Sequence, residues 1–216
     1  MPDVAIVYLP EPLSHEAAAL RIAGRSLLFR TLMTLARAGI RRIGLPGILR
    51  EQKWELPPGF PSAIAWLDHL APHERTAWTR SRPLLLPVNV LLDPVSLGRL
   101  LSAPEAPDGI ALEESKGTLF PVLLAPPDLL TSLWDRLGAG APLGDELDIH
   151  LRQNRMTLVS GSGVMIPVTD GMASRPNSVN ASERSLQAPP ASLPPACTTL
   201  SPPASPSRWG TPLGCW

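Results

Sequence analysis

DVAIVYL (3–9), SLLFRTLMTLARA (26–38) and RRIGL (41–45) are the segments that decide the fold. The first is a short apolar run, which is typical of a strand buried on both faces of a parallel sheet. The second repeats its leucines at helical spacing along one face, and Gly39 follows it as a stop signal. RRIGL then reads as the next strand. The three segments predict a strand–helix–strand unit with parallel strands.

The same alternation continues along the chain to about residue 168. Strands are predicted over 63–67, 84–90, 109–113 and 119–124, and a closing hairpin over 156–168 in which Gly161-Ser162-Gly163 forms the β-turn. Helices are predicted over 14–20 with Ser14 as the N-cap, over 94–101 and over 128–137, and a helix or loop over 144–154. Strands alternating with helices predict an α/β fold around a mostly parallel sheet.

The last part of the chain differs in composition. Residues 171–216 carry nine prolines and eight serines but one acidic residue, Glu183, and no apolar periodicity. Such a segment buries too little apolar surface to offset the entropy of ordering its backbone. We therefore predict one domain over residues 1–170 and a disordered tail over 171–216, which we interpret as an aberrant or truncated C-terminus.

Composition excludes several classes of protein. Lys+Arg and Asp+Glu balance at 19 each, so no strong field favours nucleic acid or a charged membrane surface as a partner. Cys197 and Cys215, the two cysteines, lie close to the C-terminus, which argues against a disulfide framework or a cysteine-rich zinc module. The N-terminus has no basic region ahead of its apolar run, and the apolar stretch 83–101 is broken by three prolines and by charged side chains. We expect a soluble, cytoplasmic protein.

Two carboxylates follow apolar strands, which is where ligands bind in open α/β sheets. Asp93 follows the predicted strand 84–90, and Asp170 follows Ile166-Pro-Val-Thr. Carboxylates so placed can hold Mg²⁺ together with substrate phosphates. The alternative for Asp93 is the N-cap of the helix that begins at Pro94, and for Asp170 a turn. No glycine-rich phosphate loop follows the first strand, because residues 9–15 contain no glycine.

The segments AGRSLLFRTL (23–32) and LARAGIRRI (35–43) resemble the first crossover of the sugar-phosphate nucleotidyltransferases, the GT-A-type NTP transferases. The resemblance spans residues 3–170. It is closest to the cytidylyltransferase-like domain that precedes a CDP-alcohol phosphotransferase in bifunctional inositol-1-phosphate cytidylyltransferases. It implies a three-layer, Rossmann-like nucleotide-diphospho-sugar transferase sheet. The substrates it implies are a nucleoside triphosphate, CTP foremost, and a sugar or polyol phosphate.

The resemblance also implies roles for individual residues. Arg25 stands where the family has a phosphate-contacting lysine. LPVNVLLDP (86–94) resembles the segment that ends in a metal-binding aspartate, with Asn89 in that position and Asp93 nearby, and Asp170 matches the second metal carboxylate. The implied cofactor is Mg²⁺, which neutralises charge as a substrate phosphate attacks the α-phosphorus of CTP.

Residues 9–15 depart from the family, which has a glycine-rich nucleotide loop after the first strand. A neutral Asn89 is also a poorer Mg²⁺ ligand than an aspartate. We therefore predict a degenerate nucleotidyltransferase-like domain whose catalytic residues the sequence does not identify. The alternative is a non-catalytic α/β module that binds a nucleotide, a sugar phosphate or a protein partner.

Overall fold

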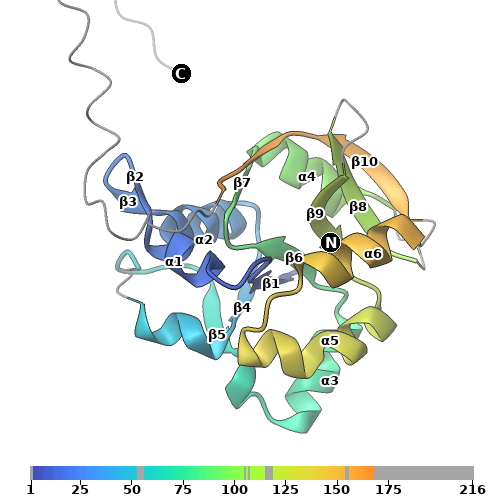
Figure 1. The fold of residues 1–216 in the computed structure, drawn as a ribbon, viewed down its shortest axis with the longest axis horizontal. Helices are drawn as coiled ribbons and strands as arrows, with labels where there is room; N and C mark the ends of the chain where they lie inside the picture. The colour runs from blue at the N-terminus through green and yellow to red at the C-terminus, as the bar shows by residue number, and fades with distance from the viewer. Residues whose placement is uncertain are drawn as a thin grey trace, which may run out of the picture. The chain divides into compact units, whose positions relative to one another are not determined.

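A seven-stranded mixed sheet forms the centre of the protein (Figure 1). The computed structural model describes residues 2–52, 56–104, 106, 108–114, 119–153 and 156–167, which fall within one compact unit, Met1–Pro176. The strand order is β10-β8-β9-β6-β1-β4-β5. These strands are β1 (Val4–Tyr8), β4 (Arg42–Leu45), β5 (Ala63–Trp66), β6 (Leu84–Pro87), β8 (Ile110–Glu114), β9 (Leu119–Leu124) and β10 (Thr157–Gly161).

The predicted strand–helix–strand unit is confirmed. β1 pairs in parallel with β4, with Ala5 opposite Ile43, and pairs in parallel with β6 on its other side. Helix α2 (Leu27–Arg37) lies in the connection between β1 and β4. Its N-cap Ser26 accepts a hydrogen bond from the Phe29 N–H at 3.1 Å. β4 pairs in parallel with β5, and β9 is antiparallel to β6 and β8. The α/β class is therefore confirmed.

The remaining elements lie on or beside this sheet. They are α1 (Ser14–Ala19), α3 (Pro72–Arg80), α4 (Pro94–Ser102), α5 (Pro127–Ala139), α6 (Gly144–Gln153), the 3₁₀ turns η1 (Gly47–Glu51) and η2 (Leu67–His69), and the short strands β2 (Arg21–Ile22), β3 (Arg25–Ser26), β7 (Val90–Leu92) and β11 (Gly163–Met165). None of the helices described has the length and apolar character needed to cross a bilayer.

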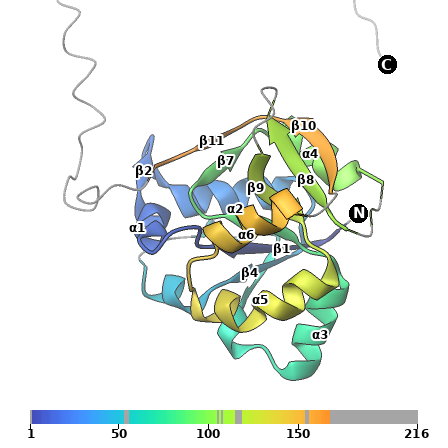
Figure 2. The same ribbon diagram turned by 45° about the vertical axis from the view of Figure 1, so that its right-hand side comes forward.

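The predicted hairpin over 156–168 is wrong. β10 pairs in parallel with β8 at the edge of the main sheet, whereas β11 pairs antiparallel with β7 in a separate ribbon. Figure 2 shows β11 running from β10 toward β2. Gly161-Ser162-Gly163 is therefore a crossover between two sheets and not a turn. A Cβ at Gly161 would lie 2.9 Å from the Ser96 Cβ, so only glycine brings the chain this close to α4.

Two smaller expectations also need correction. The run 84–90 is not one strand, because β6 ends at Pro87 and β7 begins at Val90 in a different sheet. Ser14 is not the N-cap of α1, which is Leu13. Ser14 is the first helical residue, and its Oγ accepts a hydrogen bond from the Glu11 N–H at 3.0 Å. Residues 171–216 lie outside the described residues, so the predicted tail stays a prediction.

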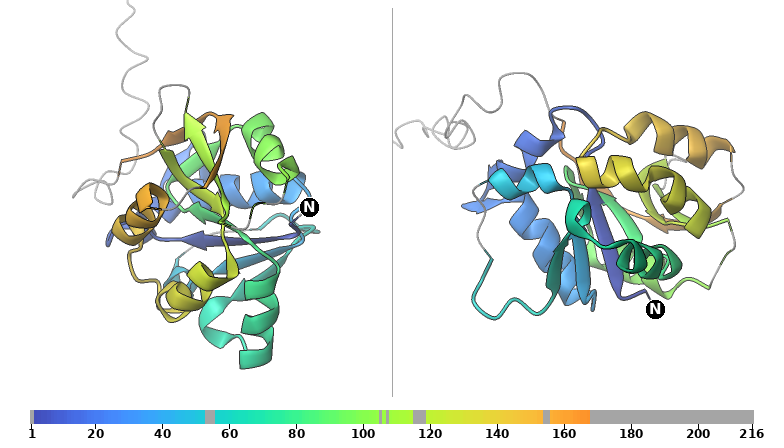
Figure 3. Two further views of the ribbon diagram at one scale, coloured as in Figure 1. Left: turned by 90° about the vertical axis from the view of Figure 1, so that its right-hand side faces the viewer. Right: turned by 90° about the horizontal axis from the view of Figure 1, so that it is seen from below.

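Side chains alternate between two cores on opposite faces of the sheet. Ala5 and Val7 of β1 pack in one cluster with the leucines of α2 and α4, while Ile6 and Tyr8 pack in the other with α3, α5 and α6. Figure 3 shows α2 and α4 on the other side of the central sheet from α3 and α5. Because β1 is buried on both faces, it reads as an uninterrupted apolar run.

Candidate functional site

Asn89, one of the residues predicted from the sequence, follows the carboxyl end of β6. β6 ends at Pro87 beside the end of β1, where the Val88 N–H donates to the Tyr8 carbonyl at 2.9 Å. The chain then runs through Asn89 and β7 to Asp93. In open α/β sheets this edge is where ligands bind, so it is the candidate site.

Asn89 is 1% exposed and joins this edge to the end of β11. Its Nδ2 donates to the Ile166 carbonyl at 3.1 Å, and the Ile166 N–H donates back to the Asn89 carbonyl at 2.9 Å. The Asn89 Oδ1 is buried without a hydrogen-bond partner among the described residues. An unpaired buried oxygen is costly, and its presence marks Asn89 as a candidate functional position.

Asp93 is the N-cap of α4, as one of the two alternatives predicted. Its Oδ2 accepts hydrogen bonds from the Ser96 N–H at 3.0 Å and from the Ser96 hydroxyl at 3.1 Å. The Ser96 backbone N–H holds the pKa of the Asp93 carboxyl below its ordinary value, with the hydroxyl and Arg99 acting in the same direction. The Ser96 Oγ accepts in turn from the Ser162 N–H at 2.8 Å. The cap therefore also fixes the crossover from β10 to β11.

Arg25 lies on the ribbon formed by β2 and β3. Its side chain is exposed, and its guanidinium carbon lies 5.0 Å from the centre of the Phe29 ring. Among the described residues, no hydrogen bond or ion pair links Arg25 to Asn89 or Asp93. β11 runs from β10 toward this ribbon (Figure 2).

The loop after β1 forms hydrogen bonds with the start of α6 and with Ser14. The Leu143 and Gly144 N–H groups at the start of α6 donate to the Leu9 and Pro10 carbonyls, each at 2.9 Å. The Glu11 N–H is satisfied by the Ser14 Oγ. This contact with α6 was missed at the sequence level, where no feature of residues 143–144 identifies their partner.

The residues at this edge do not by themselves form a magnesium site. Among the described ranges, no three His, Cys, Asp or Glu side chains lie close enough to hold a metal ion. Asn89 offers a neutral, buried oxygen, and the Asp93 carboxylate is engaged by Ser96. Mg²⁺ prefers carboxylates, water and phosphate oxygens in octahedral geometry. Asp170 lies outside the described residues.

The comparisons with known proteins give structural similarities alone. No family model and no curated protein matches the sequence. A solved structure of an Rv0371c homologue from Mycobacterium sp. strain JC1 is 16% identical, with a TM-score of 0.47 over 76% of this chain and 90% of that one. The manganese complex of Rv0371c from Mycobacterium tuberculosis is 15% identical, with a TM-score of 0.45 over 73% and 86%. The 2-C-methyl-D-erythritol 4-phosphate cytidylyltransferase from Thermus thermophilus is 17% identical, with a TM-score of 0.40 over 79% and 94%.

Proposed function

We propose that this chain is a degenerate nucleotidyltransferase-like domain that binds a nucleoside triphosphate or a sugar or polyol phosphate at the carboxyl ends of its parallel strands. The observation that carries the proposal is the pair of hydrogen bonds between Asn89 and Ile166. These bonds hold Ile166 near the carboxyl end of β6, and Ile166 precedes Asp170 by four residues in the sequence. The resemblance requires the segment that contains Asn89 and the segment that leads to Asp170 to lie at the same edge of the sheet. Finding these two segments at opposite ends of the sheet would have argued against the resemblance.

The loop after β1 favours the binding of a nucleotide or sugar phosphate over rapid transfer of a nucleotidyl group. Pro10 and Pro12 have no backbone N–H, and the Glu11 N–H donates to the Ser14 Oγ, so this loop offers no row of free N–H groups to a triphosphate. Arg25 is the exposed cation proposed to contact phosphate. Asn89 and Asp93 line the edge, and Asp170 is the carboxylate on which a Mg²⁺ dependence rests.

The test is a thermal shift of the full chain with CTP, UTP, GTP and ATP, each with and without Mg²⁺. We expect one nucleotide to raise Tm in a metal-dependent way; at a hundred times its Kd the stabilisation is about 2.7 kcal/mol. Asp170→Asn removes the metal-dependent part and Arg25→Gln weakens the shift. The matched control is Asp108→Asn, which changes an exposed carboxylate away from this edge.

A flat response to all four nucleotides contradicts the proposal and favours a second candidate, a module that packs on a protein partner. Large apolar side chains are exposed on neighbouring elements: Val95 of α4 (60%), Leu158 of β10 (48%), and Val164 (62%) and Met165 (45%) of β11. Exposed apolar surface of this kind marks contact sites in soluble proteins when it is contiguous.

A further inference from the structure

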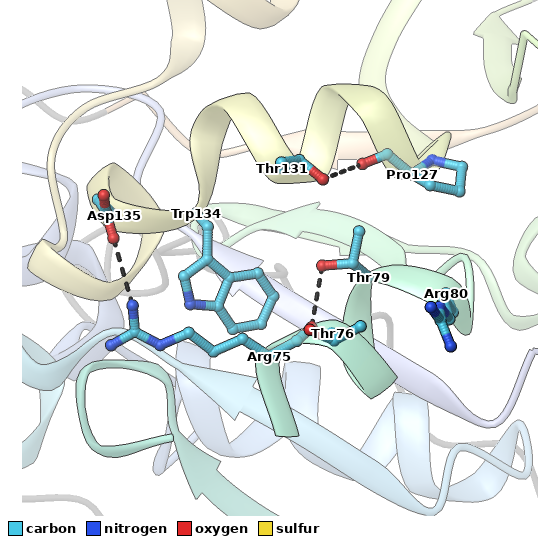
Figure 4. A pocket seen from close by; sticks show the side chains of 8 residues that line it. All are labelled: Arg75, Thr76, Thr79, Arg80, Pro127, Thr131, Trp134 and Asp135. Atoms are coloured by element: carbon cyan, nitrogen blue, oxygen red, sulfur yellow. Dashed lines mark hydrogen bonds and ion pairs between the residues drawn. The ribbon is translucent and has the colours of Figure 1, made fainter. Parts of the chain in front are cut away.

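A cavity lies between α3 and α5, and it shares no residue with the carboxyl edge of the sheet. Its volume is about 400 Å³, near the lower end of ligand-binding pockets, so it suits a small molecule. Figure 4 shows its lining: Arg75, Thr76, Thr79 and Arg80 from α3, and Pro127, Thr131, Trp134 and Asp135 from α5.

The two arginines mark opposite ends of this cavity (Figure 4). The Arg75 guanidinium is held by the Leu70 carbonyl at 3.0 Å and by Asp135 at 3.4 Å, so its charge is balanced. Arg80 is exposed and has no ion-pair partner within the described chain. Pro127, at the N-terminal turn of α5, lines the cavity as well. The Arg80 guanidinium is therefore the charged lining group at this end, since Asp128 in the first turn of α5 is exposed and does not line the cavity.

The three threonines present acceptors to the cavity. Each hydroxyl donates its proton to the carbonyl four residues earlier in its own helix, at distances of 3.0 Å for Thr76, 2.9 Å for Thr79 and 2.9 Å for Thr131. A hydroxyl that donates to backbone keeps oxygen lone pairs for a ligand. The middle of the cavity is thus suited to hydroxyl groups, which can donate to these oxygens.

Trp134 forms a wall of the cavity and carries an unsatisfied donor. The residue is 6% exposed, and its Nε1–H is buried without an acceptor among the described residues. Buried indole N–H groups usually find a partner, so this exception calls for an explanation. The indole stands beside the Arg75 side chain (Figure 4), and Asp135 in that ion pair is 94% exposed. An ion pair this open is weak enough to rearrange when a ligand arrives.

We propose that the cavity between α3 and α5 binds a small phosphorylated polyol. The phosphate contacts Arg80, whose guanidinium matches phosphate geometry. The hydroxyl groups donate to the Oγ atoms of the three threonines, and the carbon skeleton lies against the indole of Trp134. This inference does not rest on the function proposed for the carboxyl edge.

The test is isothermal titration calorimetry of the full chain with glycerol 3-phosphate, inorganic phosphate and glycerol as separate probes. We expect glycerol 3-phosphate to bind at least about tenfold more tightly than inorganic phosphate, and glycerol to give no measurable binding. Arg80→Gln weakens the binding of glycerol 3-phosphate about tenfold, the effect of one charge-assisted hydrogen bond. The matched control is Arg37→Gln, since Arg37 is likewise an exposed arginine in the last turn of a helix.

A second readout follows an NMR signal of the wild-type protein during the titration. The Trp134 indole N–H signal in NMR, assigned by its loss in Trp134→Phe, shifts during titration with glycerol 3-phosphate. Titration without Mg²⁺, in EDTA, separates this binding from the metal-dependent binding proposed at the carboxyl edge. The proposal is overturned by absent binding, by equal affinity for inorganic phosphate, by equal losses in Arg80→Gln and Arg37→Gln, or by binding that leaves the Trp134 signal unmoved.

Discussion

At the scale of single residues, Gly44 shows how closely the sheet and its helical layer approach. It lies in the middle of β4, and a Cβ there would lie 2.6 Å from the Leu67 Cδ2 and 2.9 Å from the Trp78 ring. Both neighbours are buried, so neither side chain can move away freely. The absent side chain is therefore a packing requirement of this strand.

Gly44→Ala is expected to destabilise the protein by about 1–3 kcal/mol, the usual cost of overpacking a core. The control is Gly98→Ala in α4, where a Cβ meets no atom within 4 Å. That change is expected to stabilise by about 0.5–1 kcal/mol, because alanine favours a helix interior over glycine. Urea unfolding measures both, and equal effects in the two variants would contradict the packing argument.

A second residue-scale prediction concerns Asp93 and pH. Its pKa is lowered in the folded state by the Ser96 N–H, so its ionised form stabilises the fold above the unfolded pKa of about 3.9. That contribution is lost as pH falls through the lower, folded value.

Asp93→Asn retains a good N-cap but does not titrate. We expect the Tm of the wild type to fall more steeply than that of Asp93→Asn between pH 4 and pH 2. Thermal unfolding monitored by circular dichroism across this range tests the prediction. Parallel Tm curves for the two proteins would rule out a stabilising charge at this cap.

At the scale of elements, α2 depends on its cap as well as on its apolar face. Ser26→Ala removes the hydrogen bond to the Phe29 N–H and is expected to cost about 1 kcal/mol. Ser132→Ala is the control, because Ser132 lies exposed inside α5 and donates to the Leu129 carbonyl. Its replacement should be neutral or slightly stabilising. Denaturant midpoints distinguish the two, and a neutral Ser26→Ala would mean that the cap contributes nothing to α2.

At the scale of the whole molecule, the sheet separates two cores that should respond independently. Leu32 of α2 belongs to one cluster and Leu130 of α5 to the other, and both are fully buried. Leu32→Val and Leu130→Val are each expected to cost about 1 kcal/mol, for one lost methylene and the space it leaves.

The free energy of unfolding of the variant that carries both Leu32→Val and Leu130→Val is expected to fall by the sum of the two single losses, within about 0.5 kcal/mol. The two residues share no cluster, so their effects should add. The pair Leu32→Val and Leu28→Val, from a single cluster, serves as the contrast. A clear departure from additivity for Leu32 and Leu130 would show that the two cores are coupled through the sheet.

The alternation of strands and helices could be predicted from the sequence, because the apolar runs and helical spacings of β1, α2 and β4 are strong local signals. The sequence also identified the Asp93 cap as one of two alternatives, since an aspartate just before a proline at the start of a helix is a local signal. The prediction of a hairpin over 156–168 was wrong, because two consecutive strands have the same sequence pattern whether they pair with each other or with strands of different sheets. The pairing of β10 with β8, the pairing of β11 with β7 and the contact of Asn89 with Ile166 became known from the three-dimensional structure. These pairings link residues up to 77 positions apart, and no local propensity specifies such contacts.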